Sequence, residues 1–168
     1  MEASLLEQIY KKYGRRVYLY IYSLCRNQAV AEDILQEVFL KAFLALTPEH
    51  GNMKAWLYMV ARNLVFNAGK KSSKECLSEE PWILSSGYAQ QKDGLYYVLR
   101  NEKYSHLYAC IDRLPERKKE ILMLQYFGDL SIREIAAIMH LSQENVRVLS
   151  HRAKKELKIM MEVNGYEI

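Results

Sequence analysis

The stretch from Gly128 to Lys158 constrains the fold more than any other part of the chain, because it has the pattern of a helix-turn-helix. Ser131 and Glu134 have the S-x-x-E spacing of a capping box, in which two backbone donors at a helix start are satisfied reciprocally. Apolar residues then recur at helical spacing until a break after His140, and Ser142 can cap a second helix. The stretch therefore predicts two helices joined by a tight turn.

The second of these helices has two chemically different faces. Its apolar residues are spaced 3, 4 and 4 apart and predict one buried stripe: Val146, Leu149, Ala153 and Leu157. From position 142 to 158 there are five Lys/Arg against two Glu, a net charge of +3. A basic face opposite a buried stripe is typical of a helix in a DNA major groove. The side chains predicted to reach base edges are Gln143, Asn145, Arg147 and His151.

The alternative is that these charges are only the solvated face of an ordinary helical hairpin. The paired caps and the short turn favour DNA binding over that alternative. They do not say what the binding is for.

Composition limits the class of protein. A chain of 168 residues suits one large domain or two small ones, and a net charge of +4 permits a nucleic-acid partner without demanding one. The three cysteines form no C-x-x-C pair and suggest no disulfide framework, which fits a reducing cytoplasm. The sequence shows no signal peptide and no apolar run near the roughly 18 residues of a membrane span. We therefore expect a soluble cytoplasmic protein with no membrane insertion.

Two long helices are predicted before residue 47. Ser4 and Glu7 repeat the capping-box spacing and predict the start of the first, and Arg26–Gln28 is expected to be a turn. The second is expected from Ala29 to about Leu46. Three residues lie outside its apolar stripe and give an acidic and polar surface on a basic protein: Asp33, Gln36 and Glu37. Helix solubility is the simpler explanation of that surface.

A loop over residues 47–52 precedes a third predicted helix at 54–71, which Asn52 can cap. From Lys54 to Lys74 the charge is +5, with no acidic residue in the interval. Asn63 and Asn67 are four apart and share a face. Amides, aromatics and cations on one element suit contact with unpaired bases, although Trp56 by itself is better explained as a core anchor.

The periodicity fails over residues 72–104, which are rich in Ser, Gly and charge and predict a flexible linker. Helices resume near Ser105 and again after Pro115, and Gly128 is expected to end the latter in the left-handed conformation. His106 and Cys110 are four apart, but two ligands alone make a poor zinc site. No phosphate-binding loop, nucleophile elbow or H-E-x-x-H motif occurs, so neither a metal, a cofactor nor catalysis is expected. The prediction is an all-α chain of two small helical domains, the second a four-helix helix-turn-helix domain.

Three segments, AEDILQEVFLKAF, KAWLYMVARNL and RLPERKKEILMLQYFGDLSIREIAAIMHLSQENVRVLSHRAKKELK, together resemble the extracytoplasmic-function (ECF, group IV) sigma factors of bacterial RNA polymerase. The similarity covers roughly residues 5–71 and 105–160, in the family's order. It implies a region 2 domain at 1–71, a linker at 72–104 that threads toward the polymerase active site, and a region 4 domain at 105–168.

The resemblance also implies three sets of site residues. Those that would dock on the β′ clamp helices of core polymerase are Asp33, Gln36, Glu37 and Phe39. Those that would bind the melted −10 element, together with the loop at 47–52, are Asn52, Trp56, Arg62, Asn63, Asn67 and Lys70. Those that would bind the −35 element are Ser142, Gln143, Asn145, Arg147, His151, Arg152 and Lys154.

Three positions depart from the family pattern. Asn67 stands where many members carry Asp, and Lys70 stands where many carry Arg, so a bidentate guanidinium is replaced by a point charge. His140 stands at a usual turn Gly and is expected to accept a positive φ.

The function expected is therefore that of a sigma factor, a non-enzymatic subunit that binds core RNA polymerase, including its β subunit, and promoter DNA. An anti-sigma factor is a further partner that the family implies. The alternatives are a free-standing helix-turn-helix regulator and, from other classes, a protein-interaction adaptor or a helical enzyme.

Overall fold

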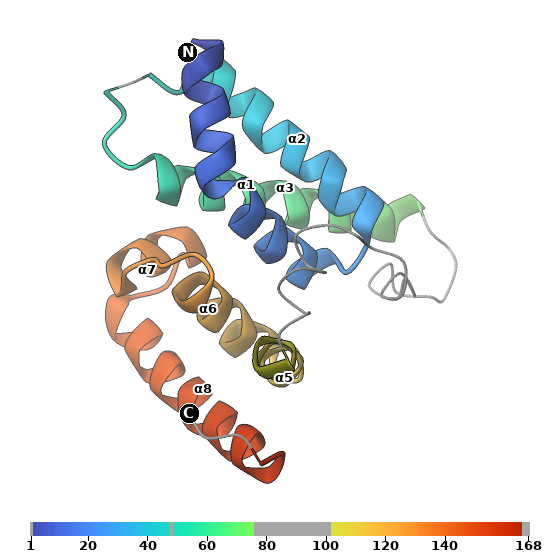
Figure 1. The fold of residues 1–168 in the computed structure, drawn as a ribbon, viewed down its shortest axis with the longest axis vertical. Helices are drawn as coiled ribbons and strands as arrows, with labels where there is room; N and C mark the ends of the chain where they lie inside the picture. The colour runs from blue at the N-terminus through green and yellow to red at the C-terminus, as the bar shows by residue number, and fades with distance from the viewer. Residues whose placement is uncertain (1, 48, 76–101, 166–168) are drawn as a thin grey trace. The chain divides into compact units, whose positions relative to one another are not determined.

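The computed structural model describes residues 2–47, 49–75 and 102–165, and every regular element in these ranges is an α-helix (Figure 1). The chain divides into two compact units, Met1–Gln90 and Gln91–Ile168. The prediction of an all-α chain with two helical domains is confirmed. Among the described residues, no helix combines the length and the apolar character needed to cross a membrane.

The first unit contains three helices: α1 (Ala3–Cys25), α2 (Gln28–Ala45) and α3 (Met53–Glu75). Each helix packs against the other two. The largest fully buried side chains of the unit include Tyr20, Tyr22 and Tyr58. The Tyr20 and Tyr58 rings meet edge to face, with centroids 5.4 Å apart. The core of this unit is therefore aromatic as well as aliphatic.

The starts of α1 and α2 differ in how they are capped. Asn27 caps α2, its side chain accepting a hydrogen bond from the Val30 N–H at 3.1 Å. The capping box predicted at Ser4 is wrong, because Ser4 lies inside α1. The Leu5 and Leu6 amides donate to the Glu2 carbonyl at 3.1 Å, so the helix has begun before the serine could cap it.

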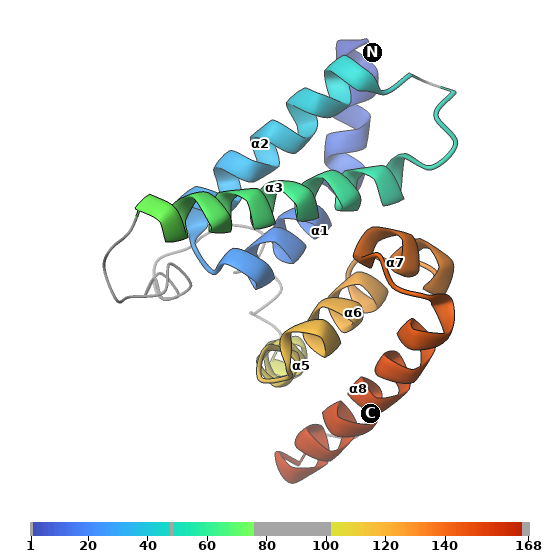
Figure 2. The same cartoon turned by 180° about the vertical axis from the view of Figure 1, so that it is seen from behind.

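The second unit contains four helices: α5 (Glu102–Asp112), α6 (Glu116–Tyr126), α7 (Ile132–Met139) and α8 (Gln143–Val163). Figure 2 shows α7, the turn after it and α8 in sequence. Helix α8 packs on the other three, most extensively on α6. The unit thus has the four helices predicted, with a helix-turn-helix at α7 and α8.

The buried stripe of α8 differs in one position from the predicted stripe. Val146, Ala153 and Leu157 are buried as expected, but Leu149 is half-buried and Ser150 is 4% exposed. Ser150 is buried because its hydroxyl has a hydrogen-bond partner on α6, which removes the cost of burying it.

The end of α6 also differs from the prediction. The residue in the left-handed conformation is Asp129, with φ of 50°, and not Gly128. Gly128 is needed for a different reason: a Cβ there would lie 2.6 Å from the Leu124 carbonyl oxygen. The glycine therefore permits a close approach of backbone to backbone.

The predicted linker lies mostly outside the described residues, which stop at 75 and resume at 102. Helix α3 extends to Glu75 and α5 begins at Glu102, so both helices reach into the range predicted to be linker. The side chains of residues 70–75 and 102–105 also lie outside the described part.

Candidate nucleic-acid interface

The helix-turn-helix is held by the local contacts that its sequence predicted. The Ser131 hydroxyl accepts from the Glu134 N–H at 3.1 Å, and the Glu134 carboxylate accepts from the Ser131 N–H at 2.8 Å. The Ser142 hydroxyl accepts from the Asn145 N–H at 3.1 Å. Both helix starts are therefore fixed, which orients the exposed face of α8.

His140 closes the first helix in the left-handed conformation, with φ of 56° and ψ of 42°. The amides of His140 and Leu141 both donate to the Ala136 carbonyl, the latter at 3.0 Å. The predicted positive φ is confirmed. The turn keeps a glycine-like geometry without a glycine.

The side chains predicted to bind the −35 element are all exposed: Ser142, Gln143, Asn145, Arg147, His151, Arg152 and Lys154. Among the described residues, no ion pair involves Arg147, Arg152 or Lys154. Cations without a protein partner can neutralise phosphates at no cost in broken salt bridges. That these side chains contact DNA stays a prediction, and the geometry is compatible with it.

Two ion pairs in this unit serve its packing. Lys118 of α6 pairs with Glu156 of α8, and Lys119 of α6 pairs with Asp112 of α5 at 3.8 Å. Lys119 is buried and Lys118 is half-buried. These lysines join helices, whereas Arg147, Arg152 and Lys154 of α8 have no ion pair among the described residues.

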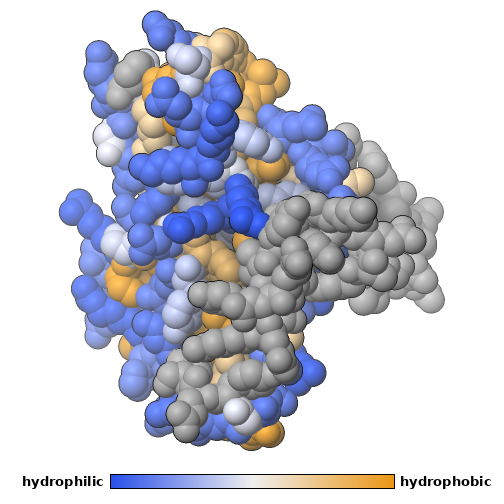
Figure 3. Space-filling model, viewed as in Figure 1, coloured by the Kyte–Doolittle hydropathy of each residue, from blue (hydrophilic) through white to orange (hydrophobic). Residues whose placement is uncertain are grey.

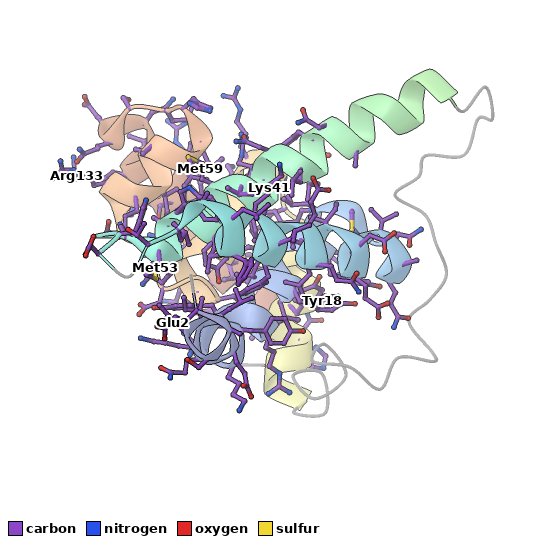
Figure 4. The ribbon with its side chains drawn as sticks, turned by 90° about the horizontal axis from the view of Figure 1, so that it is seen from above. Glu2, Tyr18, Lys41, Met53, Met59 and Arg133 are labelled. Carbon is purple, nitrogen blue, oxygen red and sulfur yellow. The ribbon has the colours of Figure 1, made fainter. Side chains whose placement is uncertain are left out.

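The residues predicted to bind the −10 element lie at the start of α3 and along its length. Asn52 caps α3, its side chain accepting from the Ala55 N–H at 3.2 Å, ahead of Met53, which is labelled in Figure 4. Trp56 is half-buried and its ring meets that of His50 edge to face at 6.5 Å. Asn63 and Asn67 are both exposed. The side chain of Lys70 falls outside the described residues.

One aromatic residue on α3 was missed by sequence reasoning. The Phe66 side chain is 43% exposed, and the guanidinium of Arg62 lies 4.5 Å from its ring centroid. Phe66 adjoins Asn67 and lies three residues after Asn63, so amides, a cation and an aromatic ring gather on one side of α3. The i, i+4 spacing of Arg62 and Phe66 in the sequence could have indicated that the two side chains meet on one face of the helix.

The outward face of α2 carries the polar residues predicted to bind the polymerase. Asp33, Gln36 and Glu37 are exposed, and Glu37 pairs with Lys41, labelled in Figure 4, at 3.8 Å. The face continues with Leu40, Phe43 and Leu44, which are 58%, 36% and 75% exposed. This apolar continuation was not among the features predicted for the helix.

Phe39 requires a correction. Its side chain is only 5% exposed and its ring packs edge to face on Tyr10 of α1, with centroids 4.9 Å apart. Phe39 therefore supports α2 from beneath and does not belong to the exposed face that carries Asp33, Gln36 and Glu37.

On the face shown in Figure 3, hydrophilic colour predominates and hydrophobic colour occurs as separate patches. Arg133 extends away from α7 in Figure 4, in keeping with its exposure.

Within the described residues, no three His, Cys, Asp or Glu side chains lie together as metal ligands would. Cys25 is buried at the end of α1, and burial raises the pKa of its thiol to about 11.

Comparison with known proteins follows the same division of the chain. Residues 9–75 match the family model of sigma-70 region 2, and residues 105–157 match that of sigma-70 region 4. The ECF RNA polymerase sigma factor SigM of Bacillus subtilis is 30% identical over 156 residues, which are 92% of this chain and 94% of that protein. The RNA polymerase sigma factor YlaC of the same species is 28% identical over 158 residues, covering 91% and 90%.

A solved structure is similar in fold. It is the sigma factor RpoE in complex with the anti-sigma factor NepR from Bartonella quintana, with a TM-score of 0.67 at 19% identity. The likeness covers 94% of this chain and 96% of that one.

Proposed function

Because this chain belongs to the ECF sigma factors of bacterial RNA polymerase, we propose that it binds core polymerase and directs it to promoters by recognising a −35 and a −10 element. The observation that carries this function is the presence of region 2 and region 4 in one chain, in the family's order. A free-standing helix-turn-helix regulator would need only the second, so the match over residues 9–75 argues against that alternative.

In the proposed mechanism, α8 enters the major groove of the −35 element. Support comes from Arg147, Arg152 and Lys154, which have no ion pair within the described part of the chain and can neutralise phosphates, and from the caps that fix the starts of α7 and α8. Phosphate contacts set the position of the helix, and side chains near its N-terminal half read base edges.

The −10 element is proposed to be bound as melted strand along α3. Exposed Asn63 and Asn67 offer amide donors and acceptors to unpaired bases, and Phe66 with Arg62 offers a stacking surface. Capturing an extruded base offsets the few kcal/mol that unstacking costs. Melting is thereby coupled to recognition, and the protein needs no catalytic group of its own.

Docking on the β′ clamp helices is assigned to the outward face of α2. Asp33, Gln36 and Glu37 provide acceptors and negative charge, and the exposed Leu40 and Leu44 provide apolar area beside them. This division explains an acidic surface on a basic protein. Within the first unit, it also assigns the polymerase and the −10 element to different helices.

The same premise makes the protein a non-enzymatic, cytoplasmic factor, since the polymerase and promoter DNA are in the cytoplasm. An anti-sigma factor is proposed as an inhibitory partner, by analogy with the solved RpoE–NepR complex.

The proposal is tested by transcribing fragmented genomic DNA from the source organism with purified core polymerase, with and without this protein, and mapping the transcript starts. We expect starts that occur only with the protein and that share two upstream sequence blocks. Binding of this protein to duplex DNA without any new start would contradict the proposal.

A further inference from the structure

Val148 is an apolar side chain on the outward face of α8, and it was not among the residues expected to bind DNA. It is 42% exposed, whereas Val146, two residues earlier, is fully buried. Two residues of helix rotate the side chain by about 200°, so Val148 lies opposite the buried stripe. In a helix whose outward face enters a groove, that position is the one nearest the groove floor.

The charges around Val148 follow the same geometry. Arg147 and Lys154 are seven positions apart and lie along one flank of the exposed face, and Arg152 lies one turn after Val148 toward the other. Glu144 lies one turn before Val148 and is also exposed. Exposed Lys155 lies in the same row two turns after Val148. An acidic residue is repelled by phosphates, so in a major groove the row at Glu144 and Val148 would face base edges and the flanking cations would face the backbone.

We propose that Val148 reads the C5-methyl group of a thymine in the −35 element, an inference that rests on the proposed function of this helix. In the major groove only thymine presents a methyl group, and apolar side chains contact it. Valine suits the task because its branched side chain has one strongly preferred rotamer in a helix and loses little entropy on contact. Val148 is then a specificity-determining residue among phosphate-binding neighbours.

The alternative is that Val148 is an isolated surface apolar residue, which soluble proteins commonly carry. The two interpretations differ in one measurable property. If Val148 is only a surface residue, removing the thymine methyl leaves the affinity for the duplex unchanged. If Val148 contacts that methyl, removing it lowers the affinity.

The experiment uses the complex of this protein with core polymerase and a duplex obtained by in vitro selection with that complex. Each thymine of the −35 element is replaced in turn by deoxyuridine, which lacks only the methyl group. We expect one replacement to weaken binding about fourfold, the size expected for one buried carbon. The Val148→Ala protein should bind the thymine duplex about fourfold more weakly and should no longer distinguish thymine from deoxyuridine at that position.

Val163→Ala is the matched control, because Val163 is 80% exposed at the far end of the same helix, and it should keep the discrimination. Three results would overturn the inference alone: a selected −35 element without thymine, no effect of any deoxyuridine, or an equal effect in the Val148→Ala protein. Failure of the complex to select any duplex would contradict the proposed function as well.

Discussion

The Ser150 hydroxyl of α8 donates a hydrogen bond to the Gln125 side-chain oxygen of α6 at 2.7 Å. Ser150 is 4% exposed, so this polar contact lies in the interface that holds α8 on α6. A buried hydroxyl is tolerated there because it is paired, and the pair fixes the register of the two helices.

Replacing Ser150 with Ala should therefore destabilise the second unit by about 1 kcal/mol, because the Gln125 oxygen loses its donor. The Ser150→Ala/Gln125→Leu double variant should lose less than the sum of the single variants, because no polar group remains unpaired. Hydrogen exchange of the α6 and α8 amides measures both. Additive losses would show that the contact contributes nothing to the packing of α8.

His140→Gly should stabilise the second unit, because His140 is held at a φ of 56°, where a side chain costs about 1 kcal/mol. The expected rise in the melting temperature is about 4 °C. His140→Ala keeps the Cβ and should give no such gain. An equal rise for both variants would mean that the histidine side chain, and not the backbone, carries the cost.

Gly128→Ala should destabilise the second unit although Gly128 does not have a positive φ. The new Cβ would lie 2.6 Å from the Leu124 carbonyl oxygen, so the backbone must shift. Gly51→Ala is the matched control, since a Cβ there meets nothing within 4 Å. The change in melting temperature caused by Gly128→Ala should differ in sign or size from the change caused by Gly51→Ala. Identical thermal unfolding curves for the two variants would contradict the close approach of a Cβ at position 128 to the Leu124 carbonyl.

Asp33→Asn should weaken the complex with core polymerase by about fivefold, because it removes one charge from the α2 face while keeping its shape. Glu7→Gln changes an exposed acid on α1 and is the control, expected to bind as the unaltered protein does. Titration of labelled protein with core polymerase gives the dissociation constants. An equal loss of affinity for core polymerase in both variants would mean that net charge causes the effect, and would contradict a docking role for the α2 face.

Cys25 should be almost unreactive in the folded protein. Its thiol has a pKa raised by burial from 9.0 to about 11, so at pH 8 the thiolate is about one part in a thousand of the total, against about a tenth in the unfolded chain. Alkylation followed by peptide mass spectrometry should show labelling at least about 100-fold slower than in urea. Because the thiolate is the reactive form, the rate should rise about tenfold per pH unit up to pH 11. Fast labelling at pH 8 would contradict the burial at the end of α1.

Local signals were the most predictable part of this structure. The capping box of Ser131 and Glu134 and the cap of Ser142 depend on residues three apart, and the sequence contains all that they need. The left-handed conformation of His140 was predicted from the resemblance, because His140 stands where the family usually has a turn Gly.

Contacts between helices were less predictable. Ser150 could not be assigned to the core without Gln125, which is 25 residues away. Phe39 was placed on the polymerase surface by the resemblance alone, and its packing on Tyr10 of another helix shows that it is buried. Val148 lies outside the apolar stripe predicted for this helix, and the structure shows that it is exposed.

The proposed sigma function can be measured by run-off transcription from a promoter mapped with this protein. With core polymerase and the protein together, we expect a transcript that is lost when either the −35 or the −10 block is replaced by unrelated sequence. Arg152→Ala should reduce that transcript without weakening the complex with core polymerase. A transcript that persists without the protein, or after both blocks are replaced, would contradict the proposed function.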